Sequence, residues 1–106
     1  MIKVYLAEDQ ELLNTALTMI LNLESDIEVI GSAMDGEEAL ADILRLKPEI
    51  VLLDIEMPRL SGLVIAHQLR LLEMDTKIMI LTTFARDSYF QQALRNDVNG
   101  YMLKDS

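Results

Sequence analysis

The fold is constrained most by a regular alternation between short apolar runs and longer segments with the apolar spacing of helices. Runs of this kind, rich in Val, Ile and Leu, are typical of strands buried on both faces of a parallel sheet. Strands that alternate with helices along a chain predict an α/β fold with right-handed crossovers. The five predicted strands span residues 2–7, 27–32, 50–54, 77–83 and 100–104.

Four segments between these strands have helical spacing. In the second of them, Asp35 is followed three residues later by Glu38, a pattern typical of a capping box at a helix N-terminus. The first carries one apolar stripe, made up of Leu12, Leu13, Ala16, Leu17, Ile20 and Leu21. The remaining two helices are predicted over residues 60–72 and from a cap at Asp87 or Ser88 to about Asn96.

The composition narrows the class of protein. A chain of 106 residues is long enough for one domain. The 18 acidic and 9 basic residues give a net charge of -9, which argues against nucleic-acid binding by this chain, because phosphate contacts need a basic face. The absence of cysteine excludes disulfides and cysteine-based metal sites. No apolar run is long enough to cross a membrane and no targeting segment opens the sequence, so a cytoplasmic location is expected.

Polar residues gather where the predicted strands end. If the strands take the order 2-1-3-4-5, as in flavodoxin-like sheets, the order reverses between the first and the third strand, and ligands bind at such a reversal. Glu8 and Asp9 follow the first strand, and Asp54 ends the third. These carboxylates are therefore expected to converge, with Thr82 and Lys104 flanking Asp54 on the other side.

Three converging carboxylates repel one another and raise the pKa of at least one of them. A hard divalent cation relieves this repulsion, and Mg²⁺ (or Mn²⁺) prefers oxygen ligands of this kind. A lysine and a threonine hydroxyl beside the carboxylates suit phosphoryl transfer, in which charge neutralisation and positioning dominate. An aspartate can itself accept the phosphoryl group, so the residues favour Asp54 as a nucleophile.

Each of these residues also has an ordinary structural explanation. Asp9 is equally suited to capping the first helix, and Asp54 could cap a helix that follows it. Thr82 is a good strand former, and Lys104 fits a solvated charge. The coincidence of polar groups at four strand ends favours a functional site over these separate explanations.

The chain contains the stretches "AEDQ" (7–10), "LLDIEMPRLSG" (52–62), "ILTTF" (80–84) and "GYMLKDS" (100–106). These stretches resemble the receiver domain of bacterial two-component response regulators, and the resemblance covers the whole chain. The motifs "LTTFARDSYFQQAL" (81–94) and "GYMLKDS" look like the NarL/LuxR-type subfamily, whose members carry a helix-turn-helix DNA-binding domain after the receiver.

The resemblance implies a flavodoxin-like (CheY-like) doubly wound five-stranded parallel sheet with strand order 2-1-3-4-5. Residues 1–106 would then be a receiver domain that is cut before its fifth helix and lacks the DNA-binding effector domain. The resemblance also assigns the acidic site. Asp54 matches the phosphoacceptor, Glu8 and Asp9 match the acidic pair that positions Mg²⁺, and the backbone carbonyl of Glu56 matches a third protein ligand of the metal.

The remaining matched residues surround the phosphoacceptor in the family. Thr82 matches the hydroxyl that follows the phosphoryl group on activation, and Lys104 matches the lysine that pairs with that group. Tyr101 matches the aromatic switch residue that turns inward when the threonine moves. Pro58 and Gly62 match the loop that shapes the pocket.

The resemblance therefore implies a phosphoacceptor in signal transduction rather than an enzyme that turns over a substrate. A partner sensor histidine kinase would phosphorylate Asp54 in a Mg²⁺-dependent reaction and so switch a transcriptional output. Self-phosphorylation from small donors and autodephosphorylation are expected as well. The implied partners are the kinase, the protein's own C-terminal helix-turn-helix domain and, on phosphorylation, a second copy of the chain.

Three other classes of protein share parts of this pattern. A haloacid-dehalogenase-like phosphatase also uses an aspartate nucleophile with Mg²⁺, but it usually has Asp where this chain has Glu56, and a cap domain for which this chain is too short. A flavodoxin-like flavin or nucleotide binder needs a phosphate loop after the first strand, where Glu8 to Glu11 would repel phosphate. A pseudo-receiver, which acts without phosphorylation, typically lacks the nucleophile or the acidic pair.

Overall fold

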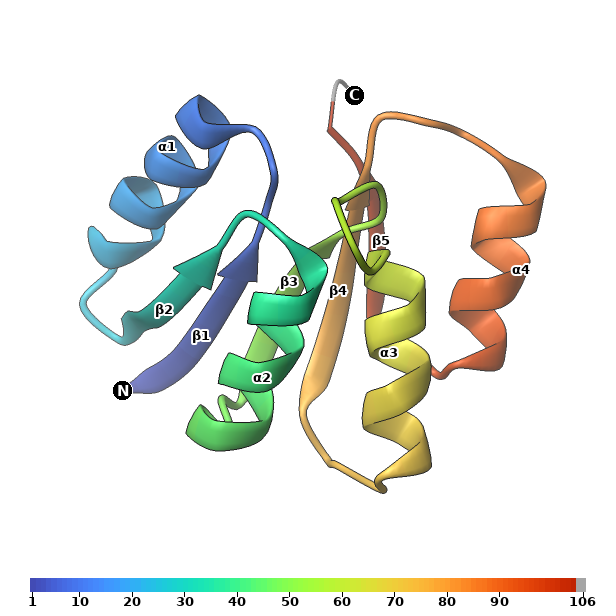
Figure 1. Ribbon diagram of the computed structural model, residues 1–106. Coiled ribbons are helices and arrows are strands. Elements are labelled where there is room, and N and C mark those ends of the chain that lie inside the picture. Colours follow the sequence, from blue (N-terminus) through green and yellow to red (C-terminus); the bar gives the residue numbers. More distant parts are fainter. Residues whose placement is uncertain (105–106) are drawn as a thin grey trace.

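Residues 1–104 are described by the computed structural model, and they form a five-stranded sheet with four helices (Figure 1). Asp105 and Ser106, the last two residues of the C-terminal motif, lie outside the described residues. The strands are β1 (Ile2–Ala7), β2 (Ile27–Ala33), β3 (Ile50–Asp54), β4 (Lys77–Thr82) and β5 (Gly100–Leu103). The helices are α1 (Glu11–Asn22), α2 (Gly36–Leu46), α3 (Gly62–Leu71) and α4 (Asp87–Arg95).

The strand order β2-β1-β3-β4-β5 confirms the predicted topology. All neighbouring strands pair in parallel, so their carboxyl ends lie at one edge of the sheet, the upper edge in Figure 1. In the β1–β3 ladder Ala7 pairs with Leu53. The next residue on each of these strands is Glu8 or Asp54, so the register alone brings the two carboxylates to adjacent positions.

One buried cluster holds the sheet to three of the helices. Alternate residues of β1, β3 and β4 point to the same face, as the two-residue period of a strand requires. This cluster includes side chains of α2, α3 and α4, and the handedness of the crossovers places α1 on the opposite face. The strand residues in the cluster are Tyr5, Ala7, Ala33, Val51, Leu53, Ile78 and Ile80.

Capping residues decide where the helices begin. Asp35 caps α2 as predicted, and its side chain accepts a hydrogen bond from the Glu38 backbone N–H at 2.9 Å. Helix α3 begins at Gly62 rather than at residue 60, because the Ser61 side chain caps it. The predicted cap at Asp87 or Ser88 is wrong. Arg86 holds the extended cap position, and Asp87 is already the first helical residue of α4.

Replacing Asp35 with Ala is expected to lower the free energy of unfolding by about 1 kcal/mol, because the Glu38 N–H loses its acceptor. Asp35→Asn keeps a side-chain acceptor while removing the 3.4 Å ion pair with Arg59. Urea unfolding of both variants separates the cap from the ion pair. Equal losses in the two variants would assign the effect to the ion pair instead.

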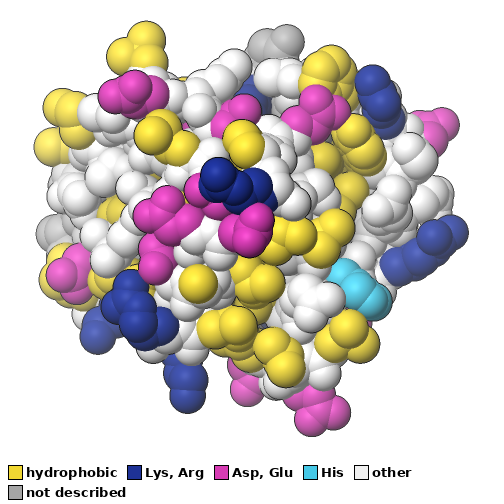
Figure 2. Space-filling view, viewed as in Figure 1, with side chains coloured by type: hydrophobic (Ala, Val, Ile, Leu, Met, Phe, Trp, Pro, Cys, Tyr) yellow, Lys and Arg dark blue, Asp and Glu magenta, His cyan; other side chains and the backbone are white. Residues whose placement is uncertain are grey.

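The surface shown in Figure 2 carries scattered basic side chains, with acidic side chains between them and no single basic patch on that face. The scatter is in keeping with the net charge of -9. Among the described residues, no helix combines the length and the apolar character that crossing a membrane requires.

Candidate functional site

Three carboxylates meet at the carboxyl edge of the sheet. Glu8 and Asp9 follow β1 and Asp54 ends β3, and each offers an oxygen atom within 4.8 Å of the other two. The side chains of Glu8 and Asp54 are buried, whereas that of Asp9 is exposed. The structure thus brings together the three acidic residues selected from the sequence. Asp9 is not the cap of α1, because Gln10 takes the cap position.

A single ammonium group bridges the two buried carboxylates. The Lys104 Nζ atom lies 2.7 Å from Glu8 Oε1 and 3.0 Å from Asp54 Oδ2. The Lys104 side chain is only 9% exposed, so these contacts are shielded from water. Lys104 is therefore not a solvated charge at the end of a strand. It offsets the charge of one carboxylate and leaves an excess of negative charge at the site when all three are ionised.

Burial and charge shift the protonation of the site. Burial is the main cause that raises the pKa of Asp54 to about 7, with a hydrogen bond that the protonated carboxyl donates to Asp9 adding to it and Lys104 opposing it. Burial alone would lower the pKa of Lys104, but its contacts with Glu8 and Asp54 outweigh burial and raise it. A proton on Asp54 would remove the negative charge that a nucleophilic carboxylate needs.

The free energy of unfolding of the metal-free chain is expected to respond to this shift. Because the pKa of Asp54 rises from 3.8 to about 7 on folding, the folded state holds a proton that the unfolded state releases between these values. The stability that the bound proton on Asp54 adds to the folded state is therefore fully present below a pH of about 4 and is lost as the pH rises through about 7. Urea unfolding at pH 5 and pH 8 should show wild type losing stability relative to Asp54→Asn. A difference that does not change with pH would contradict this assignment.

Thr82 and Tyr101 lie beyond the acidic group. The Thr82 side chain is buried, and its Oγ1 accepts a hydrogen bond from the Phe84 backbone N–H at 3.0 Å. This hydroxyl is thus engaged with the loop that leads into α4. The Tyr101 ring packs edge-on against Phe90 of α4, with ring centroids 5.4 Å apart. Its buried hydroxyl group finds no hydrogen-bond partner within residues 1–104.

The loop after β3 is held from two sides. The Gly62 N–H donates to the Ile55 carbonyl at 2.9 Å, and the Gly36 N–H donates to the Pro58 carbonyl at 3.0 Å. A Cβ atom on Gly62 would lie 2.1 Å from the Asp54 carbonyl oxygen, so only glycine fits at this position. The end of this loop is therefore packed closely against the backbone of Asp54, and Pro58 is held at the start of α2.

Two residues that support the site were missed from the sequence. The buried Asn14 side chain donates from Nδ2 to the carbonyls of Glu8 and Ala33, at 3.0 and 3.1 Å, and so fixes the backbone after β1. Gly36 lets the start of α2 approach the Leu60 carbonyl, which a Cβ atom would meet at 2.0 Å. The available signal for Asn14 was one amide side chain among the apolar residues of the first predicted helix.

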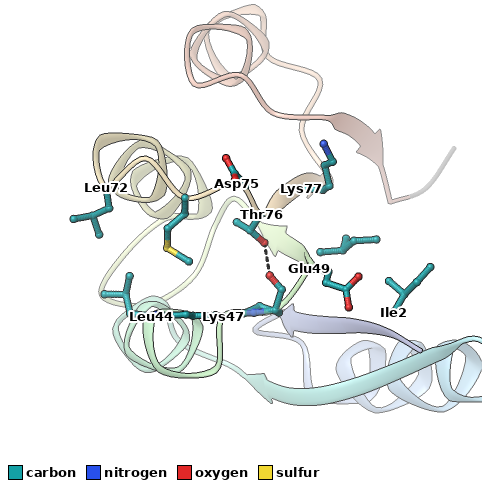
Figure 3. A pocket seen from close by; sticks show the side chains of 11 residues that line it. Ile2, Leu44, Lys47, Glu49, Leu72, Asp75, Thr76 and Lys77 are labelled. Atoms are coloured by element: carbon teal, nitrogen blue, oxygen red, sulfur yellow. Dashed lines mark hydrogen bonds between the residues drawn. The ribbon is translucent and has the colours of Figure 1, made fainter.

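A separate pocket lies at the opposite edge of the sheet, near the amino ends of the strands. It has a volume of about 910 Å³, and Figure 3 shows Leu44 and Leu72 on one side of it and Ile2 and Lys77 on the other. The Thr76 hydroxyl inside it donates to the Pro48 carbonyl at 2.8 Å and is thus satisfied. The pocket contains none of the converging carboxylates, so its size alone does not make it the candidate site.

The donor set at the carboxyl edge fits a hard cation. All three carboxylates offer oxygen atoms, two are buried, and one lysine is present to balance them. Oxygen-only donors of this kind suit Mg²⁺ or Mn²⁺ better than Zn²⁺, which prefers His and Cys. The arrangement can hold such a cation beside a carboxylate that is able to act as a nucleophile.

Comparisons with known proteins point to one family. A family model described as the response regulator receiver domain matches residues 4–106. The transcriptional regulatory protein YvfU of Bacillus subtilis is 50% identical over 105 residues, which is 99% of this chain and 52% of that protein. The transcriptional regulatory protein DesR of Bacillus subtilis is 46% identical over 106 residues, which is 100% of this chain and 52% of that protein. This chain thus spans about half the length of these relatives.

Solved structures agree with this comparison. The crystal structure of a LuxR-family DNA-binding response regulator from Staphylococcus aureus superposes with a TM-score of 0.96 at 36% identity, covering 100% of this chain and 88% of that one. The receiver domain of the putative response regulator NarL from Mycobacterium tuberculosis gives a TM-score of 0.93 at 30% identity, covering 99% of this chain and 85% of that one.

Proposed function

Because this chain belongs to the response regulator receiver domain family, as a NarL/LuxR-type receiver of a two-component system, we propose that Asp54 is its phosphoacceptor. The observation that carries the proposal is the convergence of Glu8, Asp9 and Asp54 around the Lys104 ammonium group. Buried carboxylates are costly unless something compensates them, and the excess negative charge of this group suits a site that takes up a cation.

The proposed step transfers a phosphoryl group to Asp54. An oxygen of the ionised carboxylate attacks phosphorus, and the bond between phosphorus and the donor's leaving group breaks as the O–P bond forms. The leaving group departs with the electron pair, and the product is an aspartyl phosphate. Lys104, already 3.0 Å from the Asp54 carboxylate, provides positive charge beside the group that is transferred.

Glu8, Asp9, Asp54 and the backbone carbonyl of Glu56 would hold Mg²⁺ (or Mn²⁺). When bound, the cation would neutralise negative charge on the carboxylates and on the phosphoryl oxygens. The chain's own residues would supply the rest. They orient Asp54 through its strand and through the close packing of Gly62, and they exclude water from Glu8.

The proposed response involves Thr82 and Tyr101. To contact a phosphoryl group on Asp54, the Thr82 hydroxyl would exchange its hydrogen bond with the Phe84 N–H for one with a phosphoryl oxygen. That exchange would free the loop before α4 and alter the contact between Phe90 and Tyr101. Phosphorylation of Asp54 would in this way change the surface formed by α4 and β5.

The wider role is proposed from family membership. A sensor histidine kinase would donate the phosphoryl group in the cytoplasm, and a helix-turn-helix domain of the same protein would read the change and regulate transcription. Phosphorylation could act through formation of a homodimer. The presence of a fifth helix and of a DNA-binding domain beyond these residues stays a prediction.

Intact mass after incubation with acetyl phosphate tests the proposal. Wild type is expected to gain one phosphoryl group only when Mg²⁺ is present, and Asp54→Asn is expected to gain none. Asp54→Asn is nearly isosteric and serves as its own folding control by circular dichroism. Steady release of phosphate over many turnovers would favour a phosphatase instead. A folded wild-type chain that gains no phosphoryl group would favour a pseudo-receiver.

A further inference from the structure

One hydrogen bond between residues that line the pocket beside the acidic group has no part in the chemistry described so far. The Tyr89 hydroxyl group donates to Glu56 Oε1 at 2.6 Å, joining the first turn of α4 to the loop that follows β3. Both residues line a pocket of about 540 Å³ that also contains Asp9. The contact therefore lies beside the acidic group, on a path open to solvent.

Glu56 is a fourth carboxylate that the fold keeps apart from the other three. It follows Asp54 by two residues, yet the group of acidic oxygens within 4.8 Å of one another comprises Glu8, Asp9 and Asp54 among the described residues. The contact with Tyr89 provides a physical reason, because it holds the carboxylate toward α4.

The Tyr89 ring is itself fixed in place. It packs against the buried cluster of the sheet and helices, and the Arg86 guanidinium group lies 5.4 Å from its centroid. The same guanidinium lies 5.2 Å from the centroid of the Phe84 ring, so one cation contacts two aromatic faces. Tyr89 is thus held from two directions and presents its hydroxyl group to Glu56 without a large loss of side-chain entropy.

We propose that Tyr89 is a positioning residue that holds the Glu56 carboxylate on the α4 side of the pocket and keeps its charge away from Glu8, Asp9 and Asp54. Removal of the hydroxyl group frees the carboxylate to approach the acidic group. A closer negative charge attracts a divalent cation and repels an anionic phosphodonor, so the two steps change in opposite directions. This inference rests on the proposed function of the site.

The test is a double-mutant cycle of wild type, Tyr89→Phe, Glu56→Gln and the double variant. Calorimetry measures the Kd for Mg²⁺, and intact mass measures the rate of phosphorylation by acetyl phosphate at saturating Mg²⁺. At low ionic strength, Tyr89→Phe is expected to bind Mg²⁺ about threefold more tightly and to accept the phosphoryl group about threefold more slowly. In the Glu56→Gln background, Tyr89→Phe is expected to change neither quantity.

A matched control removes a different tyrosine hydroxyl. The Tyr5 hydroxyl group donates to Asp42 Oδ2 at 2.7 Å, and neither residue belongs to the acidic group or to the pocket beside it. Tyr5→Phe is expected to leave both the Kd and the rate at the wild-type values. It therefore separates the effect of Tyr89 from the general effect of losing a tyrosine hydrogen bond.

Other outcomes overturn the inference. A purely structural role predicts that Tyr89→Phe weakens Mg²⁺ binding and slows phosphorylation together, or that the effects persist beside Gln at position 56. The inference is also overturned if Tyr89→Phe leaves the Kd for Mg²⁺ and the phosphorylation rate unchanged, or if the wild-type chain binds no Mg²⁺. If wild type binds Mg²⁺ but accepts no phosphoryl group, the proposed function fails, and the Kd values still decide the role of Tyr89.

Discussion

Replacing Lys104 with Met is expected to lower the free energy of unfolding of the metal-free chain by about 3 kcal/mol at pH 8. The variant keeps an apolar side chain of similar length but leaves Glu8 and Asp54 buried without the ammonium group that lies 2.7 and 3.0 Å from them. Loss of one partner of a buried ion pair is costly because the remaining charge has lost its hydration and has no opposite charge to compensate it.

The loss is expected to be smaller at pH 5. Without Lys104, the pKa of Asp54 rises further, since the contact with Lys104 is one of the causes that lower it. A bound proton then takes over part of the role of the ammonium group at low pH. Urea unfolding at both pH values measures the difference, with Lys77→Met, an exposed lysine at the opposite end of β4, as the control. An equal loss at pH 5 and pH 8 would assign the effect to packing rather than to charge.

Gly62→Ala is expected to cost about 3 kcal/mol of unfolding free energy and to slow phosphorylation of Asp54. The new Cβ atom would lie 2.1 Å from the carbonyl oxygen and 2.9 Å from the carbonyl carbon of Asp54. These are backbone atoms of a central strand, so the clash is relieved only if the end of β3 or the start of α3 moves. Either movement displaces the proposed nucleophile.

Gly100→Ala is the matched control for this substitution. The nearest atom to its added Cβ would be the terminal methyl carbon of Met79, at 2.8 Å, and a flexible side chain can turn away. Urea unfolding and intact mass after acetyl phosphate treatment measure both effects. If the two variants unfold at the same urea concentration, the close approach of Gly62 to Asp54 would not contribute to stability.

Much of the fold could be predicted because it follows from local patterns. The apolar runs and helical stripes predicted every strand and helix of residues 1–104. The bounds predicted for the five strands and for the last two helices differ from those observed by at most two residues. The boundary errors are local too. The start of α3 depends on the Ser61 side chain, which reaches a free N–H group of the first turn, and this depends on its rotamer. The start of α4 has no side-chain cap, because Arg86 holds the cap position through its backbone alone.

The convergence of the acidic residues was also within reach of the sequence. Parallel strands end at a common edge, so residues that follow β1 and β3 must lie near each other once the strand order is known. The alternation of strands and helices and the residues at the strand ends are properties of short segments. Hydrophobic burial and the two-residue period of strands therefore determine them without knowledge of distant contacts.

The partners of the polar side chains were decided only by the tertiary structure. The ion pair between Lys104 and Glu8 joins residues that are 96 positions apart in the sequence, and the hydrogen bond between Tyr89 and Glu56 joins residues that are 33 positions apart. Whether two such groups meet depends on the register of the strands and on how α4 packs against the sheet. A difference in either that is shorter than one side chain decides whether the hydrogen bond forms. A hydrogen bond is lost when the donor–acceptor distance grows by about 1 Å. The apolar pattern of a single segment does not determine distances this closely, whereas the packing of the core does.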